Sequence, residues 1–319
     1  MKWFSILILL AALPAMAQVD IKQQADRMEV TIDGKPFTTF YYGADTRKPY
    51  LHPLRSASGK IVSRHFPMEN IEGESKDHPH HRGLWFTHGE VNGWDFWANE
   101  ATQKGPKKTK VVLDKVGPVK SGKKKGTIQA TFNWVDPQDK PILKESRIMT
   151  FYSDPQNRIL DIDITPNALE KLHFGDTKEG TFAIRIATPL EEPTPKAKGP
   201  ARTGRMVNAE GLETESKAWG KRSAWMDYAG ELEGEKLGIA IMDHPSSTRY
   251  PTYWHSRSYG LFAANPFGIK DFTRDKTQDG SLTVEQGKSI HFRYRVVIHP
   301  GDHKAAGIAG MYEKFRRTK

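Results

Sequence analysis

The chain has 319 residues, with 48 Lys and Arg against 38 Asp and Glu, and it contains no cysteine. The absence of cysteine excludes a disulfide framework, a thiolate nucleophile and a thiolate metal site, so a hydrophobic core must stabilise the fold. The basic residues are dispersed along the chain, which argues against a nucleic-acid partner.

Residues 1–17 have the pattern of a secretory signal peptide. Lys2 gives a positive start, an apolar run follows, and the small residues Ala15 and Ala17 provide a cleavage site. We therefore expect cleavage near Ala17 and a periplasmic or secreted mature chain that folds as a single β-sandwich domain over 18–319. No later segment is long and apolar enough to span a bilayer, so no membrane anchor is expected.

Most of the mature chain has the period-two alternation of antiparallel strands that are covered on one face. In 127–135, for example, Ile128, Phe132 and Trp134 alternate with polar residues. Ten or more such segments, separated by turn signals, predict an all-β fold, specifically a large antiparallel β-sandwich. Strands are expected at 27–33, 35–42, 127–135, 142–152, 160–165, 180–187, 236–243, 259–265 and 291–299.

One helix is predicted, at the C-terminus. Asp302 can cap the segment 303–317, whose apolar residues recur at helical spacing. The face expected to pack against the sandwich comprises Ala306, Ile308, Met311, Tyr312 and Phe315. The Pro-rich, charged segment 189–205 is expected instead to form a long loop between strands.

The stretch "DHPHHRGLWFTHGEVNGWDFW", residues 77–97, contains four histidines and three tryptophans. Pro79 restricts His78, so this part is expected to be extended or in a turn. An extended chain would point His78 and His80 one way and His81 the other. The residues after Gly83 are expected to form a strand with Trp85 on the face opposite Leu84, Phe86 and His88.

Aromatic rings beside carboxylates and amides are typical of sugar binding, because a pyranose stacks on an indole while its hydroxyls need directional partners. A neutral imidazole can accept or donate a proton near pH 7. The sequence therefore predicts His80 or His81 as the acid or base, with His88 or Glu90 as the opposing or orienting group.

Two further segments contribute candidate binding residues, the stretch 243–268 and the stretch 50–60. The first is expected to lie at one end of a sheet, where loops build sites. The residues predicted to bind the substrate are His52, Arg82, Trp85, Trp94, Tyr253, His255 and Asn265.

Several of these segments together resemble a family of exported bacterial proteins known as PmoA-like. They include "YLHPLRSASGK" (50–60), the histidine-rich stretch and "IAIMDHPSSTRYPTYWHSRSYGLFAANPFG" (239–268), and the resemblance spans nearly the whole mature chain. It implies a fold like the galactose-mutarotase supersandwich, which serves epimerases, lyases and glycoside hydrolases. The family's name refers to a methane monooxygenase subunit, an integral membrane protein with long apolar helices. The mature chain has none, so a different activity is expected.

Three functions remain open on this sequence. The first is an exported carbohydrate-active enzyme with histidine-led acid/base chemistry on a sugar or oligosaccharide, as an epimerase, lyase or hydrolase. The second is a metal-dependent enzyme, in which His78, His80, His81 or His255 joins a carboxylate on a divalent metal. The third is a glycan-binding module without catalysis. The spacing assigns no metal ligands, and it leaves the oligomeric state open.

Overall fold

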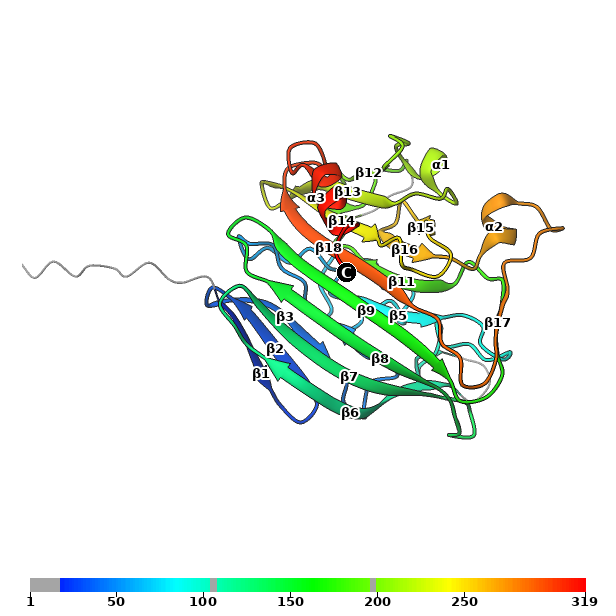
Figure 1. Ribbon diagram of the computed structural model, residues 1–319. Helices are drawn as coiled ribbons and strands as arrows, with labels where there is room; N and C mark the ends of the chain where they lie inside the picture. Colours follow the sequence, from blue (N-terminus) through cyan, green and yellow to red (C-terminus); the bar gives the residue numbers. More distant parts are fainter. Residues whose placement is uncertain (1–17, 104–107, 196–198) are drawn as a thin grey trace, which may run out of the picture.

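Two eight-stranded antiparallel sheets form a sandwich (Figure 1). The computed structural model describes residues 18–103, 108–195 and 199–319, so the predicted signal peptide, 1–17, lies outside the described residues. The first sheet has the order β1 (Val19–Gln23), β2 (Arg27–Ile32), β3 (Lys35–Tyr41), β4 (Tyr50–Leu51), β5 (Leu84–His88), β11 (Gly180–Arg185), β16 (Leu261–Asn265) and β15 (Tyr253–Ser256). The second has the order β12 (Arg205–Asn208), β13 (Trp225–Leu232), β14 (Glu235–Asp243), β18 (Phe292–Pro300), β9 (Arg158–Ala168), β8 (Pro141–Tyr152), β7 (Lys125–Val135) and β6 (Lys110–Lys120).

The predicted all-β sandwich is confirmed, and every strand segment expected from alternation corresponds to a strand. The shorter elements complete the chain. They are the two-stranded pair β10 (Leu172–Phe174) and β17 (Leu282–Val284), the 3-10 helix η1 (Thr188–Leu190), and the helices α1 (Glu215–Ala218), α2 (Ile269–Thr273) and α3 (Ile308–Phe315).

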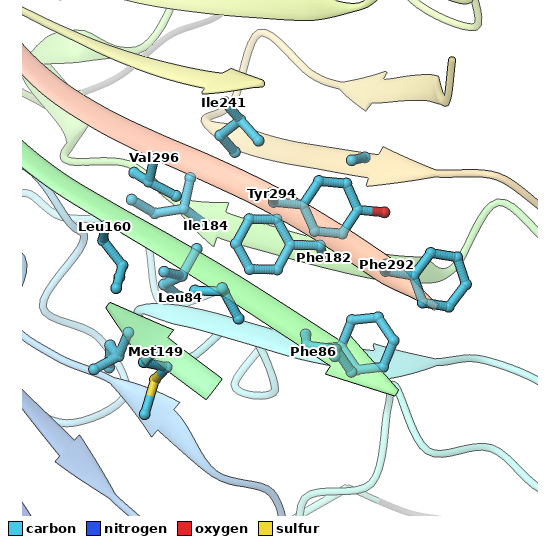
Figure 2. Close-up of a cluster of buried hydrophobic side chains, with 14 of the residues drawn as sticks. Leu84, Phe86, Met149, Leu160, Phe182, Ile184, Ile241, Phe292, Tyr294 and Val296 are labelled. Atoms are coloured by element: carbon cyan, nitrogen blue, oxygen red, sulfur yellow. The ribbon is translucent and has the colours of Figure 1, made fainter. Parts of the chain in front are cut away.

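The core lies between the inner faces of the two sheets, where large apolar side chains of both interdigitate. Figure 2 shows Phe182 of β11 against Tyr294 of β18, and their rings stack with centroids 4.5 Å apart. Leu84 and Phe86 of β5 belong to the same buried cluster. Burying each such side chain contributes about 2 kcal/mol, so this layer supplies the main driving force for folding.

The outer face of the first sheet carries the opposite set of side chains, because residues alternate along each strand. Trp85 therefore points away from the core, as predicted, and forms a small separate cluster with Trp97 and Tyr50. One row of directly paired residues crosses this face, in the order Tyr41, Tyr50, Trp85, Ala183, Ala263 and His255.

The C-terminal helix α3 is confirmed, but its predicted start is wrong. Asp302 Oδ1 accepts hydrogen bonds from the amides of Lys304 and Ala305 and so holds a turn, and the helix begins only after Gly307, which has φ +66°. The predicted face is correct. Ile308, Met311, Tyr312, Phe315 and Ala306 all pack in the cluster between α3 and the second sheet.

Gly83 fixes the entry of the chain into β5, and its replacement should be strongly destabilising. It has φ +51°, and a Cβ there would lie 2.1 Å from the Leu51 carbonyl oxygen. We expect Gly83→Ala to lower the free energy of unfolding by about 2–4 kcal/mol in urea titrations. The control is Gly93→Ala, with φ +78° and nothing within 4 Å, which should lower it by only about 1 kcal/mol. Equal losses in the two variants would contradict the steric argument.

Candidate functional site

The histidine-rich stretch enters the site through a tight turn. His78 has φ +44°, and the His81 amide donates to the His78 carbonyl at 3.0 Å. The expected turn is confirmed, and the extended alternative is wrong. Because a turn of this kind brings its first and fourth residues together, the ring of His78 stacks on that of His81. The ring of His80 meets both of them edge-on, at 5.6 and 4.4 Å between centroids.

The turn builds a column of parallel rings on the outer face of the first sheet. Trp85 lies at its base, with His81 stacked on it at 5.1 Å between centroids. His78 stacks on His81 at 4.7 Å, and Tyr259 lies parallel to His78 at 5.5 Å. Trp85 is fully buried, whereas the His78 side chain is 42% exposed, so the column runs from the sheet to solvent.

Asp77 connects the column to two buried arginines. One of its oxygens lies 3.0 Å from His78 Nδ1, and the other lies 2.5 Å from Arg64 and 3.0 Å from Arg185. Burial would raise the pKa of Asp77, but the hydrogen bond from His78 and the two guanidinium charges outweigh it and hold this pKa well below its usual range. Asp77 therefore stays ionised and fixes the ring orientation of His78.

A second carboxylate, Glu191, approaches Arg185 from the long loop that follows η1. Its Oε1 lies 3.8 Å from Arg185 Nη2, and its Oε2 accepts from Arg202 at 2.8 Å. Burial raises the pKa of Glu191 in spite of both arginines. Arg185 thus lies between two carboxylates, Asp77 and Glu191, whose pKa values are displaced in opposite directions.

A cleft of about 530 Å³ opens beside this group, in the size range of ligand pockets. Arg185, Glu191 and Tyr259 line it, so the top of the ring column and the arginine both face the space. The loop predicted at 189–205 supplies one wall. The remaining lining residues are Gly73, Glu74, Ser75, Glu192, Thr194, Gly199, Arg202 and Ser258.

The two histidines predicted as acid or base are buried and neutral. Burial, helped by the charges of Lys48 and His78, lowers the pKa of His80 to about 2. Burial likewise holds the pKa of His81 well below its usual range. His81 Nδ1 lies 3.3 Å from Arg185, and His80 Nδ1 lies 2.9 Å from Gln103. Neither lines the cleft: His81 stacks beneath His78, and His80 lies edge-on beside it.

Four other predicted residues lie away from the column. His88 points into the sandwich, where its Nε2 donates to the Gly175 carbonyl at 2.8 Å and its ring contacts Phe267. Trp94 packs against the main core, and Glu90 lies beside Gly175. The side-chain amide of Asn265 is hydrogen-bonded within the protein: its Nδ2 donates to the Thr177 carbonyl, and its Oδ1 accepts from the Phe267 amide.

The remaining predicted binding residues surround the same outer face. His255 Nδ1 accepts from the indole N–H of Trp219 at 2.9 Å, and Arg82 forms a bidentate pair with Glu100. Tyr253 stacks on Phe272 at the far edge strand, β15. His52 lies buried near Ser63 Oγ, at 3.4 Å.

Sequence reasoning did not single out Arg185, Glu191 or Tyr259. A signal existed for Arg185, because it is the one charged residue in the apolar strand β11, in the register that faces outward. Glu191 and Tyr259 lie in polar loop sequences, where nothing distinguishes them. These residues come together only because separate segments of the chain meet on the outer face of the first sheet. That meeting is a property of the tertiary fold and cannot be seen in the sequence.

Within 18–103, 108–195 and 199–319, no group of three or more His, Asp or Glu side chains is arranged to hold a metal ion. Across the same ranges, no helix is long and apolar enough to cross a membrane.

The buried histidines make stability depend on pH. The pKa is lowered to about 3 in His52 and His255, about 2 in His80 and about 4 in His88, and lies well below the usual range in His81. Below pH 6.5 these imidazoles are protonated in the unfolded chain but stay neutral in the folded chain. The free energy of unfolding therefore falls as pH falls. The raised pKa values of two groups, His65 and Asp243, oppose this effect of the five histidines, because the folded chain binds more protons at both than the unfolded chain does.

We expect the free energy of unfolding, measured by urea titration, to fall between pH 6.5 and 5.5. Each of the five buried histidines favours a loss of about 1 kcal/mol, and the opposing gains from His65 and Asp243 are smaller in sum. The slope of this free energy against pH measures how many more protons the unfolded chain binds than the folded chain. His255→Asn should reduce that number by about one. A stability that stays constant over this interval would contradict the neutral, buried state of these imidazoles.

The sequence matches the model of a family of unknown function, DUF6807, over residues 27–313, and no curated protein matches it. Similar solved structures include an α-galactosidase from Lactobacillus brevis (9% identity, TM-score 0.37, covering 89% of this chain and 40% of that one). They also include a galactose 1-epimerase from Lactobacillus acidophilus NCFM (9%, TM-score 0.39, 89% and 98%) and a polysaccharide lyase (12%, TM-score 0.36, 92% and 33%).

This chain therefore spans 40% of the length of that α-galactosidase. At TM-scores of 0.36 to 0.39, these likenesses carry no argument about activity, which depends on the site itself. The family match extends over most of the chain and identifies it: the protein belongs to the family DUF6807.

Proposed function

We propose that the protein is an exported carbohydrate-active enzyme. It removes a proton from, and donates a proton to, a sugar or sugar derivative bound in the cleft beside Tyr259. One observation carries this proposal. The half-exposed His78 is oriented by an ionised Asp77, and Arg185 joins this pair to the buried Glu191 at the wall of the cleft. The reaction class is epimerisation, β-elimination or hydrolysis.

In this assignment His78 is the base. Its Nδ1 faces Asp77, so in the neutral ring Nε2 is the nitrogen that is free to accept a proton, as in other carboxylate-oriented imidazoles. Asp77 itself is a poor base, because its pKa is held so low. This moves the proton-transfer role from His80 and His81, where the sequence placed it, to their neighbour.

Glu191 is the acid. Its raised pKa favours the protonated form, and a pair of groups with oppositely displaced pKa values is the arrangement that acid/base enzymes use. Arg185 can stabilise negative charge that develops on the sugar, because its guanidinium is fixed and buried. Tyr259, which lines the cleft, offers an aromatic surface beside the reacting group.

The signal peptide predicted at 1–17 and the resemblance to exported PmoA-like proteins support the proposed location outside the cytoplasm. His80 and His81 keep a supporting role. His81 stacks beneath His78 and contacts Arg185, so it holds both groups in place.

Replacing His78 tests the base. We expect His78→Asn to lower turnover at least about a hundredfold, in a screen of aryl glycosides, aldoses and oligosaccharides, while the melting temperature stays close to that of the wild type. The matched control is the exposed His173→Asn on β10, which should retain turnover. Loss of activity on chelation would favour the metal-dependent alternative, and sugar binding without turnover in the wild type would favour the binding module.

The pH profile tests the acid. Glu191 must be protonated to act, so activity should fall as pH rises through its raised pKa, giving an alkaline limb above the usual carboxyl range. Glu191→Gln should abolish this limb together with most of the turnover. Glu74→Gln is the control. Glu74 lines the same cleft but has a lowered pKa, because hydrogen bonds from His65 and the backbone outweigh its burial, so that variant should keep the limb.

A further inference from the structure

A second cleft lies on the outer face of the first sheet, next to the first. Its volume is about 480 Å³, and it is formed by α1, α2 and the chain after β15. Figure 1 shows α1 and α2 beside β15 and β16. The lining residues are Glu215, Ser216, Trp219, Lys221, Arg257, Phe272, Thr273 and Arg274.

Trp219 gives this cleft a fixed aromatic wall. Its indole N–H donates to His255 Nδ1 at 2.9 Å, and its ring meets Phe272 edge-on at 5.5 Å between centroids. The side chain is only half-buried, so part of the indole remains available to a ligand. An anchored, partly exposed indole is the feature on which a pyranose ring stacks.

The charge of the second cleft is positive. Lys221, Arg257 and Arg274 line it against a single carboxylate, Glu215, which leaves two positive charges. Glu215 pairs with Arg257 at 2.9 Å. In the described part of the chain, neither Lys221 nor Arg274 has a side-chain hydrogen bond or ion pair, so both cations are available to a ligand.

The first cleft has no such excess of positive charge. With Glu191 protonated, as the proposed chemistry requires, the carboxylates of Glu74 and Glu192 balance the two arginines, Arg185 and Arg202. An anionic sugar is therefore favoured in the second cleft over the first.

The two clefts adjoin at the consecutive residues Arg257, Ser258 and Tyr259. The Arg257 guanidinium lies 5.8 Å from the ring centroid of Trp219 in the second cleft and 5.7 Å from that of Tyr259 in the first. Between them, the Ser258 amide donates to Glu215 at 2.6 Å. One ligand of two or more sugar units can therefore contact both clefts.

We propose that the second cleft is a subsite for an acidic sugar, which carries a carboxylate or sulfate and is linked to the sugar that reacts in the first cleft. Trp219 stacks on the ring, and Lys221, Arg257 and Arg274 bind the anionic group. The substrate class is then an acidic oligosaccharide. This inference rests on the proposed function for the identity of the first cleft, but its test measures binding without turnover.

The test is calorimetric binding of uronate-bearing, sulfated and neutral tetrasaccharides to the full chain. We expect at least one acidic tetrasaccharide to bind at least tenfold more tightly than every neutral one, with an advantage that shrinks as salt is raised. Trp219→Ala, and Lys221→Ala combined with Arg274→Ala, should each weaken its binding about tenfold or more. The uronate and sulfate series distinguish the two anionic groups.

The control variant combines Lys120→Ala with Lys288→Ala, which removes two exposed cations elsewhere. It should leave binding unchanged, which separates a local site from general attraction by a basic protein. The inference is overturned if no acidic tetrasaccharide is preferred, or if the control weakens binding as much as the Lys221 and Arg274 variant. His78→Asn should still bind, so a failure of the proposed chemistry would appear only in turnover.

Discussion

The arrangement of the site depends on the burial of two guanidinium groups, those of Arg64 and Arg185, beneath one carboxylate. A buried, unpaired guanidinium would be unfavourable by several kcal/mol, so Asp77 must remain where it contacts both. Asp77 is the first residue of the histidine-rich stretch. Its position then determines where the turn at His78 begins, and the turn determines which rings stack on Trp85.

The same burial determines which groups can carry protons. His80 and His81 lie where water is excluded and positive charges are near, so their imidazoles stay neutral and serve as stacked, hydrogen-bonded supports. His78 extends to the surface and has a carboxylate partner. Three histidines within four positions thus differ in their access to solvent and in their partners, because they lie at different depths.

The fold could be predicted from the sequence to the extent that alternation dictates it. Long strands such as β7 and β9 alternate cleanly, and β5 was assigned correct inner and outer faces. The short strand β15 was not predicted, because four residues are too few to show a clear alternation of polar and apolar side chains. The start of α3 was wrong because Asp302 and Gly307 favour a turn before the helix, a local competition that the apolar spacing does not reveal.

The sequence indicates part of the candidate site but not how it is assembled. Residue types placed the chemistry in the stretch 77–97, whereas the partners Arg185, Glu191 and Tyr259 come from separate parts of the chain. His88 illustrates the limit. It belongs to the same histidine-rich stretch, yet strand alternation turns it into the sandwich. Residues that are close in the sequence can therefore lie on opposite faces of a sheet, because successive side chains of a strand point in opposite directions.

The pairing of β11 with its neighbours has a consequence for how the protein selects its native state. Phe182 and Ile184 face the core, while Ala183 and Arg185 face outward. A slip of this strand by one residue would place Arg185 among apolar side chains of the core, and Phe182 on the crowded outer face where the small Ala183 now packs. The cost would be far above that of the misaligned hydrogen bonds. Arg185, which lies at the centre of the candidate site, therefore also disfavours misregistered pairings of β11.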